Sequence, residues 1–102
     1  MKRGLFMRPE AESDLRDAYR WYEEQRSGLG DDFLECVEAA LLEIQANPQQ
    51  FPVIHKEVRR ALVRRFPYAV FYVPFSQTVT VLAVFHCRRD PGTWRIRLSG
   101  EK

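Results

Sequence analysis

The sequence predicts an α+β fold in the order β-α-α-β-β-β, in which a helical hairpin packs on one face of a mainly antiparallel sheet. Apolar residues recur at helical spacing in the first half of the chain, whereas segments rich in β-branched and aromatic residues fill the second half. Short turn signals separate these later segments, so consecutive strands should pair as a meander. The 102 residues are expected to form a single domain, residues 1–102.

The N-terminal part predicts a short strand followed by a helix. The apolar run at residues 4–7 is the candidate strand. Pro9 suits the first turn of a helix, because the amide hydrogen that proline lacks is not needed there. The glycine-containing segment 27–30 should end the helix. The buried face of this helix is expected to comprise Ala11, Leu15, Ala18 and Tyr22.

A second helix should begin at Asp31 or Asp32, because an aspartate can accept hydrogen bonds from the free backbone amides of a first turn. It should end at Asn47, because the residue before a proline is pushed out of the helical region. Residues 48–56 are predicted to form a loop. The buried face of this helix is expected to comprise Phe33, Val37, Ala40, Leu41 and Ile44. The three later strands are expected within residues 57–65, 66–73 and 78–86.

Charge is distributed unevenly along the chain, although the net charge is only +2. Residues 1–50 carry eleven acidic and six basic side chains, whereas residues 51–102 carry three acidic and ten basic ones. Eight of these ten are arginines, whose planar guanidinium suits phosphate and carboxylate groups. The pattern predicts an acidic helical layer behind a basic sheet that meets an anionic partner.

Several classes of protein are not expected. The apolar runs are too short for a membrane span or a secretory signal, so the prediction is a cytoplasmic protein without a membrane partner. Cys36 and Cys87 lie far apart without a CxxC spacing, which is typical of two free thiols in a reducing compartment. Together with His55 and His86 they lack the spacing of metal ligands, and no metal or cofactor is predicted.

The last predicted strand ends in hydrogen-bond donors rather than in small turn residues. By strand alternation, Arg60 and Arg64 should share one face of the sheet and Arg59 and Arg65 the other, where some of them should pair with the acidic helices. We predict a partner- or target-binding surface that comprises Arg60, Arg64, Arg88, Arg89, Trp94 and Arg95.

The segments ALVRRFPYAVFYV and TVTVLAVFHCRRDPGTW resemble the RelE/ParE superfamily of bacterial toxins, particularly its ParE-like branch. AESDLRDAYRWYEEQ is similar to the first helix of that family, and NPQQFP to the break after its second helix. The resemblance implies a growth-inhibiting, plasmid-stabilising toxin held in a hetero-oligomer by an antitoxin with an acidic, amphipathic C-terminal segment. It also implies DNA gyrase as the target of ParE-like members, and mRNA on the ribosome as the substrate of RelE-like ones.

The two branches differ in chemistry. RNA cleavage without a metal needs a base, an acid and charge stabilisation at the phosphate. Leu62 and Ala69 stand where the resemblance implies basic residues in RelE-like members, and Trp94 cannot exchange a proton as a tyrosine can. These departures favour a gyrase inhibitor in which His86 is structural, over the alternative, a ribosome-dependent mRNA endoribonuclease. The catalytic candidates of that alternative are His86, Arg64, Arg88 and Glu57.

Overall fold

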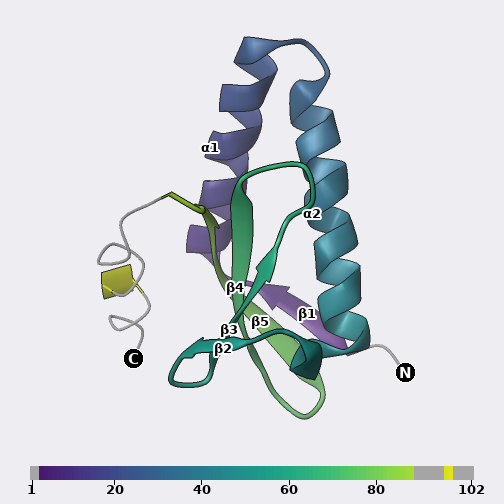
Figure 1. The fold of residues 1–102 in the computed structure, drawn as a ribbon, viewed down its shortest axis with the longest axis vertical. Coiled ribbons are helices and arrows are strands. Elements are labelled where there is room, and N and C mark those ends of the chain that lie inside the picture. The colour runs from purple at the N-terminus through teal and green to yellow at the C-terminus, as the bar shows by residue number, and fades with distance from the viewer. Residues whose placement is uncertain (1–2, 89–95, 98–102) are drawn as a thin grey trace.

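The computed structural model describes residues 3–88, 96 and 97, and it confirms the predicted α+β fold (Figure 1). Two long helices follow a short first strand, and the remaining strands come after them. The elements are β1 (Gly4–Met7), α1 (Pro9–Gln25), α2 (Leu29–Ala46), the 3₁₀ turn η1 (Pro48–Gln50), β2 (Val53–His55), β3 (Val58–Leu62), β4 (Tyr68–Pro74) and β5 (Thr78–His86).

The five strands form one sheet in the order β1-β5-β4-β3-β2. Leu5 of β1 pairs with Val79 of β5 in parallel, whereas the other neighbouring strands are antiparallel, which confirms a mainly antiparallel sheet. Strand β2 is a correction, because residues 48–56 were expected to be a loop. Three residues are too few for a period to be read, and this strand exists because Val53 pairs with Arg59 of β3.

Both helices cover the same face of the sheet, as predicted (Figure 1). The predicted helix faces are buried, except that Leu15 and Leu41 are only partly buried. Phe33 is fully buried at the centre, and the ring centroids of three other aromatic residues lie 5.0–5.3 Å from its own. Those residues are Tyr22, Phe66 and Tyr68. The hairpin and the sheet therefore share one core.

The face of the sheet turned away from the helices is also apolar at its centre. A second buried cluster lies there, with Phe71 and Phe85 in contact at 5.6 Å between ring centroids. Strands β4 and β5 are therefore buried on both faces, which explains their nearly continuous apolar sequences. The cluster comprises Val58, Ala69, Phe71, Leu82, Ala83 and Phe85.

The start of α2 differs from the prediction, because the helix begins at Leu29 and neither Asp31 nor Asp32 is its cap. Gly28 adopts a left-handed conformation with φ of 91°, which turns the chain tightly after α1. The tight turn brings Glu23 of α1 under the new helix, where its carboxylate accepts hydrogen bonds from the amides of Gly28 at 2.8 Å and Gly30 at 2.9 Å. Glu23 thus supplies the hydrogen-bond acceptor that was expected from Asp31 or Asp32.

Glu23→Ala is expected to lower the free energy of unfolding by about 1–2 kcal/mol, because two backbone amides at the start of α2 lose their acceptor. Urea denaturation followed by circular dichroism would measure this loss. Glu24→Ala, an exposed change in the same turn, should stay within about 0.5 kcal/mol of the wild type. Equal losses for the two variants would show that the carboxylate does not stabilise the turn.

Candidate functional site

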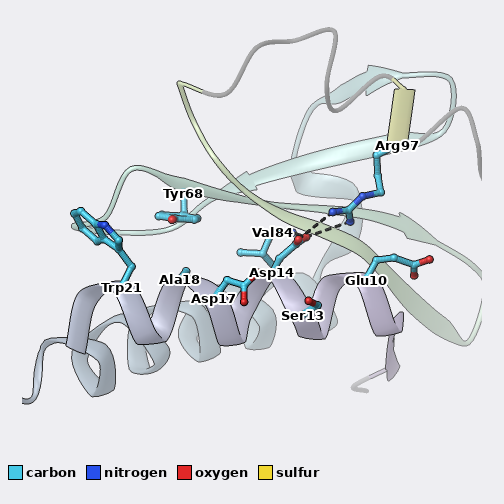
Figure 2. Close-up of a pocket in the computed structure, with 9 residues that line it drawn as sticks. All are labelled: Glu10, Ser13, Asp14, Asp17, Ala18, Trp21, Tyr68, Val84 and Arg97. Atoms are coloured by element: carbon cyan, nitrogen blue, oxygen red, sulfur yellow. Dashed lines mark hydrogen bonds and ion pairs between the residues drawn. The ribbon is translucent and has the colours of Figure 1, made fainter. Parts of the chain in front are cut away.

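A groove of about 500 Å³ lies between α1 and the outer edge of β5 (Figure 2). It forms because β1 pairs with β5 only as far as Val81, whereas β5 continues to His86. Among the described residues, no strand pairs with the outer edge of β5 beyond that point. The groove is lined by Glu10, Ser13, Asp14, Asp17, Ala18, Trp21, Tyr68, Val84 and Arg97.

An ion pair between Asp14 and Arg97 fills part of this groove. The guanidinium donates to both carboxylate oxygens, with N–O distances of 3.0 and 3.2 Å. The exposed fractions of the two side chains are 12% and 24%, so the pair is largely shielded from water. A bidentate pair of this kind has a defined geometry as well as a favourable energy. Asp14 therefore holds Arg97 in a fixed position.

The same ion pair occupies the free backbone groups of β5. The amide of Val84 donates to Asp14 at 3.0 Å, and Arg97 donates to the carbonyl oxygen of Leu82 at 3.4 Å. A neighbouring strand would supply the same acceptor and the same donor. The guanidinium of Arg97 also lies 4.7 Å from the ring centre of Phe85, whose side chain belongs to the cluster on the face turned away from the helices. The side chains of Asp14 and Arg97 thus take the place of a missing strand.

An aromatic hollow of about 390 Å³ continues the groove, since Trp21 and Tyr68 line both. Trp21 is 55% exposed although it is the largest side chain of α1. His86 borders the hollow, with its ring centroid 5.2 Å from that of Tyr68, and its Nδ1 accepts a hydrogen bond from the amide of Arg88 at 3.1 Å. A ring nitrogen that accepts a hydrogen bond carries no proton. The backbone amide of Arg88 therefore occupies Nδ1 of His86.

Glu57 and His86, two of the catalytic candidates, lie at opposite ends of the sheet. Glu57 is in the turn before β3, next to the end where Arg59 pairs with Tyr72. His86 pairs with Tyr68, four residues further along β4. Four residues of a strand span ~13 Å, and Glu57 lies beyond that distance. The carboxylate consequently does not orient the imidazole in this structure.

The predicted common face of Arg60 and Arg64 is wrong. Arg60 is exposed and lies opposite Phe71, on the face away from the helices. Strand β3 ends at Leu62, so alternation does not reach Arg64, which lies in the following turn and lines a shallow hollow with residues of α2, among them Glu43. The two arginines therefore belong to different surfaces.

The other basic residues of the second half have varied roles. Arg59 donates to the carbonyl oxygens of Gln49 and Phe51, at 3.2 and 2.6 Å, and so ties η1 to the sheet. Arg65 lies in the turn before β4, and Arg88 is exposed just after β5. The ion pair with an acidic helix is made by Arg97, which is not one of the four arginines expected to pair in this way. Three predicted binding residues lie outside the described residues: Arg89, Trp94 and Arg95.

Sequence reasoning missed the groove, since it treated the acidic residues of the helices only as a charged layer behind the sheet. A usable signal was present, because Glu10, Asp14, Asp17 and Trp21 recur at helical spacing on a face other than the buried one. In the described part of the chain, no three acidic, histidine or cysteine side chains are grouped to hold a metal ion. Nor does either described helix combine the length and the hydrophobicity that crossing a bilayer requires.

The chain is similar to known toxins. Residues 5–91 match the family described as the ParE toxin of the type II toxin-antitoxin system, parDE. The toxin ParE2 of Mycobacterium tuberculosis is 28% identical over 101 residues, which cover 98% of this chain and 96% of the relative. A structure of the chromosomal ParDE system of P. aeruginosa has a TM-score of 0.74 at 16% identity and covers 83% of this chain and 96% of its own. A mutant of the E. coli toxin RelE in the free state has a TM-score of 0.72 at 15% identity, with both chains covered completely.

Proposed function

This chain belongs to the ParE toxin family of type II toxin-antitoxin systems, and from this membership we propose that it arrests growth by inhibiting DNA gyrase until a cognate antitoxin neutralises it. The match over residues 5–91 carries the proposal, because it extends from β1 beyond the end of β5. Gyrase is a cytoplasmic target, so the proposed site of action is the cytoplasm. The antitoxin would hold the toxin in a hetero-oligomer.

The surroundings of His86 support gyrase inhibition over RNA cleavage. The hollow that it borders is otherwise lined by Trp21, Tyr22, Pro67 and Tyr68, and these lining residues include no carboxylate and no arginine. Tyr22 and Tyr68 could exchange a proton, but cleavage of RNA without a metal also needs a cation at the scissile phosphate, and no lysine or arginine is among the described residues that line the hollow. Leu62 and Ala69, at the positions where the resemblance implies basic residues, pair across β3 and β4. Binding without chemistry fits this arrangement better.

Exposed arginines support an anionic partner. Arg60, Arg64 and Arg88 are all exposed, although they stand on separate parts of the surface. A long, partly disordered segment that folds on contact can reach separate patches, because it wraps around its partner. We therefore propose that these arginines bind the acidic, amphipathic C-terminal segment of the antitoxin, and that they bind gyrase when the toxin is free.

Expression of the chain alone should arrest growth and cause filamentation and a DNA-damage response. The purified chain should impair supercoiling by gyrase in vitro, and mRNA on ribosomes should stay intact. Co-expression of the antitoxin encoded beside it should restore growth. Unimpaired growth at confirmed soluble expression would contradict the toxin role. Cleavage of translated mRNA with gyrase unaffected would assign the chain to the endoribonuclease alternative instead.

His86→Gln should leave the chain folded and toxic, because glutamine keeps the polar side chain and gyrase inhibition needs no proton transfer. If His86 were a general acid or base, the rate of RNA cleavage would fall by ~10²–10⁴-fold and toxicity with it. The measurement is growth arrest at matched soluble expression, with thermal melting to verify folding. A folded but harmless variant would contradict gyrase inhibition.

Arg88→Ala should lose potency in the same assay, because a charge-assisted contact contributes about 1.5–3 kcal/mol to binding. The matched control is Arg20→Ala, which removes an exposed arginine of α1 for which no role is proposed. The control should remain as toxic as the wild type. Equal potency of both variants would show that Arg88 is only a solvated surface residue.

A further inference from the structure

We propose that the groove between α1 and β5 binds an extended, basic segment of the antitoxin, which pairs with the free edge of β5 and places an arginine or lysine on Asp14 in exchange for Arg97. This inference rests on the proposed function, since it names the chemistry of the neutralising partner at one particular site. The cationic contact proposed here is additional to the contacts between the exposed arginines and the acidic segment of the antitoxin.

The free edge of β5 supplies the first argument. Strand β1 ends at Met7, opposite Val81, whereas β5 continues to His86. Two of the outward backbone groups of β5 are bonded to side chains, because the Leu82 carbonyl accepts from Arg97 and the Val84 amide donates to Asp14. An edge whose donors and acceptors are not paired with another strand is a template for an added strand. By alternation, the amide of His86 faces the same edge.

The charge of the groove supplies the second argument. Its wall on α1 carries three carboxylates, those of Glu10, Asp14 and Asp17, and Arg97 is the only basic residue among the described residues that line it (Figure 2). Arg8 lies beside the groove at 4.0 Å from Glu10. If Arg97 left without a replacement, Asp14 would remain largely shielded and without its cation. The incoming segment must therefore bring a positive charge to this point.

The aromatic hollow supplies the third argument and a spacing. It is lined by Trp21, Tyr68 and His86, at the level where β5 ends, whereas Asp14 bonds at Val84. Alternate residues of a strand point to the same side, about 6.6 Å apart. A segment with a basic residue and an apolar residue two to four positions away would fill both places at once. Trp21, 55% exposed, would be covered by the apolar side chain.

Amide hydrogen exchange of the full-length chain tests the pairing directly. On addition of the purified antitoxin encoded by the adjacent gene, exchange at the His86 amide should slow by about 10-fold or more, because it gains a strand partner. The Phe85 amide faces β4 by alternation and is the internal control, so its exchange should change little. Unchanged exchange at His86 in a complex that does form would overturn the inference. Protection of His86 in the free chain that rises with its concentration would assign the groove to a second copy instead, and would also overturn it.

Two substitutions test the exchange of cations, because they should act in opposite directions. Asp14→Asn should weaken antitoxin binding by about 10-fold or more through loss of the charge-assisted pair. Arg97→Gln should strengthen binding several-fold, because the antitoxin no longer competes with the chain's own guanidinium. Glu24→Gln and Arg20→Gln are the matched controls, with exposed side chains outside the groove, and should bind like the wild type.

The outcomes separate this inference from the proposed function. Calorimetric titration gives the affinities, and thermal melting verifies that each variant is folded. If Asp14→Asn is unfolded, Arg97→Gln and the exchange at His86 still decide. If the antitoxin binds the wild type, and binds Arg97→Gln with equal or lower affinity, the inference is overturned and the proposed function is not. Failure of the antitoxin to bind the wild type overturns both.

Discussion

Phe33→Ala is expected to cost about 3–5 kcal/mol of the free energy of unfolding, which is a large part of the stability of a small domain. Phe33 has no exposed surface, and its ring joins α2 to the aromatic residues of α1 and of the sheet. Alanine would leave a cavity between the two layers, since the backbone elements around it are long and cannot collapse far. Urea denaturation at neutral pH, followed by circular dichroism, measures the loss.

Leu34→Ala is the matched control, because it removes a neighbouring side chain of α2 that is 36% exposed. Its loss should stay below about 1.5 kcal/mol. Similar losses for both variants would contradict the view that the aromatic cluster unites the helical hairpin with the sheet.

Stability should fall steeply at alkaline pH, because burial raises the pKa of Tyr72 to about 12 from its ordinary value of 10.0. The folded chain then holds the phenolic proton more tightly than the unfolded chain does. The resulting stabilisation is fully present below pH 10 and is lost as the pH rises from 10 to 12. Two units of pKa correspond to about 2–3 kcal/mol. Denaturation in urea at pH 8, 10 and 12 would follow the loss.

Tyr72→Phe provides the control for this pH dependence. The phenol donates to the carbonyl oxygen of Pro48 at 2.6 Å, so the variant should be less stable by about 1–3 kcal/mol at pH 8. It should then lose less stability than the wild type between pH 10 and 12, because the group that titrates there is gone. Parallel losses in the two proteins would rule out Tyr72 as the source of the alkaline transition.

The parts of the fold that were predicted correctly are those that repeat a local pattern. The buried faces of α1 and α2 follow helical spacing over four turns or more, and β4 and β5 are long apolar segments. Strand β2 and the start of α2 were predicted wrongly, because both depend on tertiary contacts. Val53 becomes part of a strand through Arg59, and α2 begins early because Glu23 lies beneath it.

The groove could not be derived from the sequence, because it results from a difference in length between two paired strands. Asp14 and Arg97 are 83 residues apart, and neither residue type predicts the other at that separation. The arginine cluster was read through strand alternation, and this reading failed at Arg64 because β3 ends before it. The resemblance identified the family correctly, whereas the charges at the edge of β5 required the three-dimensional arrangement.

Among the described strands, the parallel pairing of β1 with β5 places the first to be synthesised beside the last. The helical hairpin and the meander need only local contacts, but Leu5 must wait for Val79, and Asp14 for Val84, 70 residues later. At a translation rate of about 5–20 residues per second, the nascent chain spends ~4–15 s with β1 unpaired. Throughout this delay, the toxin is expected to be unfinished and harmless, and the groove proposed for the antitoxin is completed only at its end.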